Sequence, residues 1–368
     1  MKFINRIFDI KFDKSFRASL DKKINKVLDK GFLSNHDFCR LLEKRYSFLN
    51  NSKFGLAVSN GTSALEVLLK SINVKNKKVL IGTNTFIATA VAVENCGGIP
   101  VPIDIESQFW GLCPENLKKS ISKDIGAVIV IHIGGIITPL IQEIKSICDS
   151  KKVPLIEDCS QAHFSSFKNT NAGNFGYGGT FSFYTTKNIT CGEGGLVVTN
   201  NIKTYIKIKS LRQFGVTLKN KDDHKYLGSN YKMSELNACF ALCDIERFRI
   251  RFKRREMIAK RYQYNLKNSP WKCIEPIEGK SSYYKQIIIS PIKRKNLLKN
   301  LLKKKIQLTG GVYNIPLHNQ SRYKNIFNLK NFKNSNFFSN YHICPPCYPE
   351  MNFKQVDYIC EKFLEIIN

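Results

Sequence analysis

Two short runs near the middle of the chain carry side chains that could do chemistry together. The first, residues 156–163, reads Ile-Glu-Asp-Cys-Ser-Gln-Ala-His and places Asp158 at the end of an apolar, strand-like stretch. The second, residues 181–188, reads Phe-Ser-Phe-Tyr-Thr-Thr-Lys-Asn and places Lys187 just beyond another such stretch. An enzyme that uses pyridoxal 5′-phosphate (PLP) needs this pair. Its lysine amine forms a Schiff base with the cofactor aldehyde, and its acid pairs with the pyridinium nitrogen.

Two upstream runs offer further groups that such a cofactor requires. Ser59-Asn-Gly-Thr-Ser-Ala64 closes a strand and opens a helix, where free N–H groups and the hydroxyls of Thr62 and Ser63 suit a phosphate. A plain helix N-cap is the more common interpretation of such a junction. Thr85-Phe-Ile-Ala-Thr89 puts Phe86 at a strand-to-helix corner, where the ring could stack on a flat cofactor or belong to the core. The ordered set is completed by Asp158, Gln161, Ser182 and Lys187.

The elements that must position these groups alternate between strands and helices. Strand-like apolar runs occupy residues 54–59, 78–82, 99–103, 127–133, 153–157, 179–184 and 195–199. Amphipathic helical stretches lie between several of them, at residues 63–72, 87–95 and 140–150. Such alternation predicts an α/β fold with a mainly parallel sheet covered by helices on both faces. Sheets of this kind bind ligands where the strands end, which is where the chemical groups fall.

The second half of the chain predicts a smaller companion domain. Residues 201–214 are expected to form a helix, and a single long helix is expected over residues 234–267. Beyond it we expect a short strand at 284–289, a basic helix at 293–304 and a closing amphipathic helix at 353–367. We therefore predict a large cofactor-binding domain over residues 1–245 and a small C-terminal α/β domain over residues 246–368.

Composition restricts the class of protein. The 368 residues are 43% hydrophobic, which is ordinary for a globular protein. No apolar run reaches membrane-spanning length, and the N-terminal sequence lacks the apolar core and cleavage site of a signal peptide. We therefore expect a cytoplasmic protein with no membrane partner.

The net charge of +29 invites a nucleic-acid hypothesis. However, the lysines are spread along the chain, and neither the aromatic pattern of an RNA-binding sheet nor a helix-turn-helix is present. We expect no nucleic-acid partner, and the charge would instead favour an anionic substrate such as a nucleotide sugar. The twelve cysteines are expected to be free thiols without a metal, because Cys344-Pro-Pro-Cys347 has no second pair to complete a zinc site.

Six ordered motifs together resemble the DegT/DnrJ/StrS family of PLP-dependent sugar aminotransferases. Four of them are the runs described above, of which residues 181–188 are followed by Gly192-Glu-Gly-Gly. The other two are Gly228-Ser-Asn-Tyr-Lys-Met-Ser-Glu235 and residues 311–320. The resemblance covers residues 31 to about 356. It implies PLP-dependent transferase fold type I, the fold of aspartate aminotransferase, with a mainly parallel sheet in the large domain and a smaller C-terminal α/β domain.

The resemblance also implies roles for individual residues. Lys187 would hold PLP covalently and then move the proton between the substrate carbon and the cofactor. Asp158 would keep the ring nitrogen protonated, so that the ring can take up electrons from the reacting carbon. Gln161 would sit beside the ring hydroxyl, and Phe86 would stack on one ring face.

The remaining roles concern the phosphate and the substrate. Thr62, Ser63 and Ser182 would hold the phosphate. Asn230 would reach that phosphate from the neighbouring subunit, which would make the active site a property of a homodimer. His163 and His318 would lie near the sugar, with ordinary structural histidines as the open alternative.

The expected reaction is transfer of an amino group from an amino acid, with glutamate as the expected donor, to a nucleotide-linked keto-deoxy-sugar. Such a reaction belongs to surface-polysaccharide or amino-sugar biosynthesis. Relatives with histidine in place of the lysine perform dehydration, so Lys187 favours transamination. A sugar dehydratase using PLP or its amine form on the same fold and a non-catalytic basic regulatory protein remain alternatives.

Two departures from the family pattern stand out. Tyr184-Thr-Thr-Lys187 lacks the proline that many relatives have before the Thr-Lys pair. The run His132-Ile-Gly-Gly135 replaces the more usual His-Leu-Tyr-Gly and removes an aromatic ring near the substrate. The identity of the sugar therefore stays open.

Overall fold

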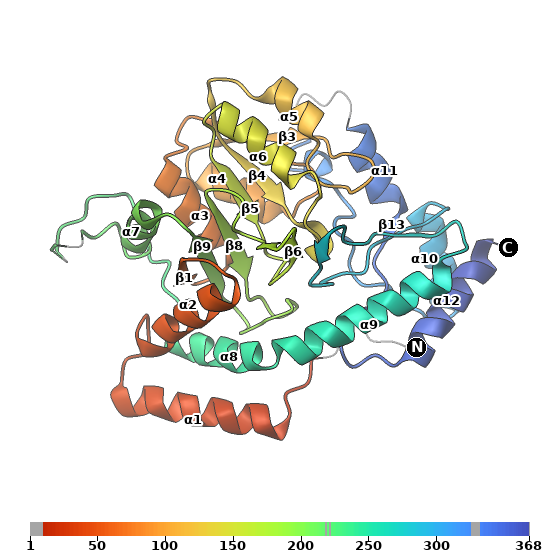
Figure 1. Cartoon of the computed structure of the whole chain (residues 1–368), viewed down its shortest axis with the longest axis horizontal. Coiled ribbons are helices and arrows are strands. Elements are labelled where there is room, and N and C mark those ends of the chain that lie inside the picture. The colour runs from red at the N-terminus through yellow and green to blue at the C-terminus, as the bar shows by residue number, and fades with distance from the viewer. Residues whose placement is uncertain (1–9, 218, 221, 325–331, 368) are drawn as a thin grey trace.

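The computed structural model describes residues 10–217, 219–220, 222–324 and 332–367. Figure 1 shows a central sheet with helices packed around it and a second group of helices, α9, α10 and α12, to one side. Two helices that the sequence interpretation did not include precede the sheet, α1 (Lys14–Lys30) and α2 (Asp37–Leu49). Both pack against a later helix, α8 (Glu235–Glu246).

In the described part of the chain, seven strands form the main sheet in the order β1-β9-β8-β5-β4-β2-β3. Their bounds are β1 (Phe54–Val58), β2 (Lys78–Gly82), β3 (Ile99–Ile103), β4 (Ile125–Ile131), β5 (Leu155–Asp158), β8 (Gly178–Ser182) and β9 (Gly195–Thr199). From β8 through β5, β4 and β2 to β3 all neighbours are parallel, whereas β9 is antiparallel to both of its neighbours. The predicted mainly parallel sheet is confirmed.

Helices cover both faces of the sheet because its strands are apolar on both sides. One face packs against α3 (Gly61–Ile72), α4 (Ile87–Asn95) and α7 (Ile202–Leu211). The opposite face packs against α2, α5 (Pro114–Ser120), α6 (Ile141–Ser150) and α8. Alternate residues of β4 divide between the two cores, with Val128 and Val130 on one side and Ala127 and Ile129 on the other.

The C-terminal part has a hydrophobic cluster of its own, formed by α9 (Phe248–Leu266), α10 (Arg294–Lys303), α12 (Phe353–Ile367) and the segments between them. A small sheet in the order β10 (Lys272–Cys273), β12 (Ile288–Ile289) and β13 (His342–Ile343) belongs to this part. A second small sheet contains β6 (Ser166–Phe167), β7 (Thr170–Asn171) and β11 (Gly279–Lys280), and it links the two parts of the chain. The remaining helical segments are η1 (Ile133–Gly135), η2 (Leu317–Asn319) and α11 (Lys333–Tyr341).

The prediction of one long helix over residues 234–267 is wrong. Helix α8 ends at Glu246 and α9 begins at Phe248, with Arg247 at the junction. No proline or glycine marks the break in the sequence. Arg247 itself keeps nearly helical torsions (φ −95°, ψ −5°). The predicted domain boundary at residues 245 and 246 falls in the last turn of α8 and stays a prediction.

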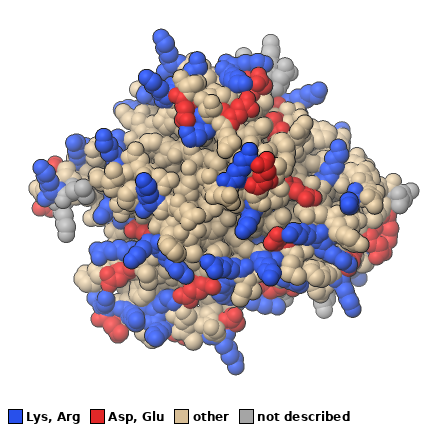
Figure 2. Space-filling model, in the orientation of Figure 1, with Lys and Arg blue, Asp and Glu red and all other residues tan. Residues whose placement is uncertain are grey.

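Charged residues do not gather in one patch on the face shown in Figure 2, where lysines and arginines are widely spread and acidic residues lie among them. No helix among the described residues combines the length and apolar character that a membrane span needs.

Candidate active site

The carboxyl ends of neighbouring parallel strands bring the predicted catalytic groups together. Asp158 is the last residue of β5, and Ser182 is the last residue of β8, the next strand in the sheet. Lys187 follows in the loop between β8 and β9. Because these strands are parallel, all three groups emerge at the same edge of the sheet.

A pocket of about 590 Å³ opens at this edge, within the size range of ligand sites. Six of the predicted site residues line it: Thr62, Phe86, Asp158, Gln161, Ser182 and Lys187. Several other residues that the sequence did not mark as site residues also line it, among them Asn60, Gly61, Thr85, Thr89, Tyr184, Glu193, Tyr284 and Tyr313. The tyrosines at 284 and 313 come from segments remote in sequence, which no local pattern connected to the site.

Hydrogen bonds fix the orientation of the Asp158 carboxylate. Thr89 Oγ1 donates to Asp158 Oδ2 over 3.0 Å, and the Ser160 amide donates to Oδ1 over 3.1 Å. The Thr85 hydroxyl lies 2.7 Å from that of Thr89 and so extends the network. Asp158 is 8% exposed, and the residual exposure faces the pocket. The acid is therefore held in one orientation at the pocket wall.

The amine of Lys187 lies beside an aromatic ring. Its Nζ is 4.8 Å from the ring centroid of Tyr284, a cation–π distance. Burial raises the pKa of Tyr284, but the positive charges of Lys187 and Lys285 outweigh it, so the net pKa is below the ordinary value. The Tyr284 hydroxyl lies 3.4 Å from Thr186 Oγ1. A residue from the C-terminal part thus faces the predicted Schiff-base lysine.

The first turn of α3 forms the predicted phosphate site. Asn60 caps this helix by accepting a hydrogen bond from the Ser63 amide over 2.8 Å. A Cβ added at Gly61 would lie 2.9 Å from Ser182 Cβ, and one at Gly195 would lie 2.2 Å from the Asn60 carbonyl oxygen. These two glycines allow the helix start to approach the end of β8, which leaves Thr62 and Ser182 on the same pocket wall.

Ser63 occupies a different position from Thr62. Its hydroxyl lies 2.9 Å from that of Ser59, and it does not belong to the pocket lining. A role of Ser63 in holding the phosphate stays a prediction. Asn230 is exposed, bridges to Gln213, and also lies outside the lining of its own pocket, so its action across a subunit boundary stays a prediction too.

Gln161 is held between two partners. Its Oε1 accepts a hydrogen bond from the Gly134 amide over 2.6 Å, and its Nε2 donates to the Tyr313 hydroxyl over 2.5 Å. Gly134 has φ 66°, and an added Cβ would lie 2.6 Å from Ile287 Cδ1, so a larger residue there would strain the backbone and displace Ile287. The ring of Tyr313 lies 5.9 Å from that of Phe86. Tyr313 thus supplies an aromatic ring to a pocket whose His132-Ile-Gly-Gly135 run lacks one.

His163 does not line the pocket of its own chain, and its expected place near the sugar stays a prediction. It is 1% exposed, its Nε2 donates to the Ser182 carbonyl over 2.9 Å, and its Nδ1 accepts from the Tyr46 hydroxyl over 2.7 Å. Burial lowers the pKa of His163 to about 3, so the ring is neutral. Its place in the structure is behind the strand end, where it holds the backbone of Ser182.

His318 is also buried and does not line the pocket of its own chain. It lies in η2, where its Nε2 is 3.1 Å from Asn336 Oδ1 and its ring stacks on Phe332 at 4.3 Å. Burial lowers its pKa. A contact between His318 and a sugar stays a prediction.

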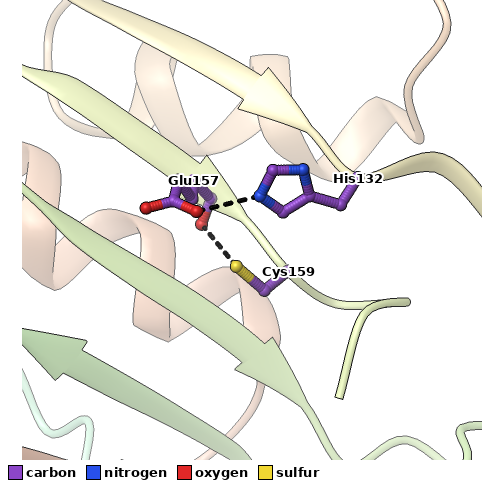
Figure 3. A group of neighbouring side chains, drawn as sticks. All are labelled: His132, Glu157 and Cys159. Atoms are coloured by element: carbon purple, nitrogen blue, oxygen red, sulfur yellow. Dashed lines mark hydrogen bonds and ion pairs between the residues drawn. The ribbon is translucent and has the colours of Figure 1, made fainter. Parts of the chain in front are cut away.

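His132, Glu157 and Cys159 form a buried group (Figure 3) outside the pocket lining, and their side chains are of types that bind metals. However, Glu157 Oε2 already accepts from His132 Nε2 (2.9 Å) and the Gly173 amide (2.8 Å). Its Oε1 accepts from the amides of Phe175 (2.7 Å) and Gly176 (2.9 Å). Cys159 Sγ faces the backbone carbonyl of Glu157, and burial raises the pKa of its thiol. The carboxylate therefore anchors the turn before β8 and has no lone pair free for a metal.

The residues of the main pocket fit PLP. An amine and an oriented carboxylate share one cavity, and hydroxyls gather at a helix start that suits a phosphate. The fold and this site together define a PLP-dependent enzyme of fold type I.

The model of the DegT/DnrJ/EryC1/StrS aminotransferase family matches residues 15–364, and the chain belongs to this family. It is a PLP-dependent aminotransferase. The chain is 30% identical over 356 residues to GDP-perosamine synthase of Vibrio cholerae, a match that covers 94% of this chain and 96% of that protein.

Solved structures show the same fold. The structure of DesI in the presence of its TDP-sugar product superposes with a TM-score of 0.90 at 21% identity, over 100% of this chain and 93% of that one. The PLP form of the putative sugar aminotransferase Spr1654 from Streptococcus pneumoniae gives 0.89 at 20% identity, over 100% and 98%.

Proposed function

We propose that the protein transfers an amino group from an amino acid, with glutamate as the donor, to a nucleotide-linked keto-deoxy-sugar. The observation that carries the proposal is that Lys187 and Asp158 line one pocket at the sheet edge. The nature of the acceptor is supported by the 30% identity to GDP-perosamine synthase, and the net charge of +29 suits an anionic substrate. Such a reaction would serve surface-polysaccharide or amino-sugar biosynthesis.

PLP, when bound, supplies an electron sink for the reacting carbon. Lys187 would hold the cofactor through Nζ, and the same amine would move the proton at the substrate carbon. Asp158, which Thr89 and Ser160 hold in one orientation, would keep a proton at the ring nitrogen. Thr62, Ser182 and the start of α3 would bind the phosphate.

We also propose that the working unit is a homodimer in which Asn230 reaches the phosphate of the other subunit. Asn230 is exposed on its own subunit and takes no part in its own pocket. The segment that carries it joins the site region through a hydrogen bond of 2.8 Å from the Ser59 amide to the Tyr231 carbonyl. In a homodimer, the partner subunit would therefore contact Asn230 near the start of α3 of the subunit that carries it.

The test is to incubate the PLP-loaded protein with glutamate and a panel of nucleotide-linked keto-deoxy-sugars, and to identify products by mass spectrometry. We expect one keto sugar to gain an amino group while glutamate becomes 2-oxoglutarate. Asp158→Asn should remove most of this activity and leave the fold intact. If no amino donor reacts while a keto sugar is dehydrated in the presence of pyridoxamine phosphate, the dehydratase alternative replaces the proposal.

A further inference from the structure

A second cavity, of about 290 Å³, adjoins the main pocket. Thr186, Tyr284 and Tyr313 line both, so the two spaces share a wall next to Lys187. The far side of the second cavity is formed by the C-terminal part of the chain, including Arg255 of α9. A small ligand attached at Lys187 could therefore extend one end into this cavity.

The charged side chains lining the second cavity are both cationic. Arg255 is 7% exposed, and its Nη1 donates to the carbonyls of Tyr283 (3.3 Å) and Cys347. Lys285 is half-buried, with its Nζ 5.3 Å from the Tyr284 ring centroid. Among the described residues, no Asp or Glu lines the cavity or forms an ion pair with Arg255 or Lys285, and Glu350 acts on Arg255 only through space.

A buried guanidinium without an acidic partner is costly, because carbonyl dipoles replace only part of its hydration. The cost falls when an anion binds. Since the described hydrogen bonds of Arg255 use Nη1, the hydrogens on Nε and Nη2 remain for a ligand. That edge of a guanidinium forms two parallel hydrogen bonds with a carboxylate.

We propose that this second cavity binds a carboxylate group of the amino-acid donor, with Arg255 as its main ligand and Lys285 at its side. The inference rests on the proposed function, which it extends by assigning the donor its own anion subsite. The cavity has about half the volume of the main pocket, 290 against 590 Å³. This size suits one end of an amino acid and leaves the space beside the cofactor in the larger pocket for the sugar.

Glutarate is the first probe, because it has two carboxylates and no amine and so binds without reacting. Its affinity for the PLP-loaded protein is measured by isothermal titration calorimetry. We expect Arg255→Lys to raise the dissociation constant on the order of tenfold or more, since the bidentate pair is lost. Lys285→Gln, which leaves the carbonyl contacts of Arg255 in place, should raise it severalfold.

Arg254→Lys is the matched control. Arg254 is the preceding residue of α9 and also donates to two carbonyls, those of Pro349 and Met351, but it does not line the second cavity. It should bind glutarate like the wild type. Wild-type affinity in both Arg255→Lys and Lys285→Gln, or equal losses in Arg254→Lys and Arg255→Lys, would overturn the subsite.

Half-reactions separate this inference from the proposed function. In Arg255→Lys, single-turnover reaction with glutamate should slow at least tenfold, while reaction with an alkylamine that has no carboxylate stays near the wild-type rate. A wild-type protein that binds glutarate but never reacts with glutamate would refute glutamate as the donor and retain the anion site. Loss of pyrophosphate affinity with unchanged glutarate affinity in Arg255→Lys would assign the cavity to the nucleotide and overturn the carboxylate proposal.

Discussion

Replacing Thr89 by valine tests whether the activity depends on the hydrogen bond that orients the Asp158 carboxylate. Valine keeps the shape of threonine but removes the hydroxyl that donates to Asp158 Oδ2 over 3.0 Å. Thr89 is 1% exposed, so water cannot easily replace the lost donor. One carboxylate oxygen would then lose its fixed partner, and Asp158 could turn away from the ring nitrogen of the cofactor.

The magnitude follows from the type of bond that is lost. A hydrogen bond to a charged group contributes about 1.5–3 kcal/mol. Since about 1.4 kcal/mol corresponds to a factor of ten, kcat/KM of Thr89→Val should fall by about 10- to 100-fold. The affinity for PLP should weaken in the same direction, because a correctly oriented acid also contributes to cofactor binding.

The assay compares steady-state kinetics and PLP titrations of three variants. Thr89→Ser keeps the hydroxyl and should recover most of the activity. Thr85→Val removes the outer hydroxyl, 2.7 Å from that of Thr89, but leaves the donor to Asp158 in place, so its effect should be severalfold at most. If Thr89→Val stays within about twofold of the wild type, or Thr89→Ser is as impaired as Thr89→Val, the hydrogen bond does not position Asp158.

Four further predictions follow from single contacts. Lys187→Ala should remove the visible absorbance of bound PLP, and a cofactor adduct still fixed by borohydride would put the attachment elsewhere. Asn230→Ala should weaken PLP retention in a homodimer, whereas a fully active monomer in sedimentation experiments would contradict the shared site. Because the pKa of His163 is lowered to about 3, the unfolded chain binds a proton at this histidine at a higher pH than the folded chain does. The protein should therefore become less stable as pH falls from 6.5 toward 3, and its free energy of unfolding should drop by about 2 kcal/mol from pH 6.5 to 5. In urea unfolding of His163→Phe, the free energy of unfolding should depend less steeply on pH, and an unchanged dependence would refute the role of His163. Glu157→Gln should lower the free energy of unfolding by about 3 kcal/mol, because hydrogen bonds to a charged acceptor are lost and the new amide NH2 faces N–H donors, and a loss below about 1 kcal/mol would contradict this.

The strand pattern was predictable because its signal is local. Continuous apolar runs bounded by turn residues placed β2, β3 and β9 with their observed bounds, and the closing helix α12 matches its prediction. The junction at Arg247 was not predictable, because the residue keeps nearly helical torsions and the direction of each helix depends on what it packs against. Helices α1 and α2 were missed although α2 supplies Tyr46, the partner of His163.

The sequence by itself determined the cofactor chemistry. Asp158, Ser182 and Lys187 follow strands whose parallel arrangement brings their ends to one edge, so their neighbourhood follows from chain order and strand pattern. Only the tertiary structure decided which way each side chain faces. It placed His163 against the Ser182 carbonyl and the Tyr46 hydroxyl, two partners that are remote from it in sequence.

The tertiary structure also decided what stands opposite the lysine. Tyr284, Tyr313 and Arg255 come from segments about 70 or more residues further along the chain than Lys187, and none of them lies in a local pattern that marks a site. Their meeting at Lys187 depends on how the C-terminal part packs against the main sheet. Such packing arises from many weak contacts between distant residues, whereas the strand and helix signals in the sequence report only on neighbours along the chain.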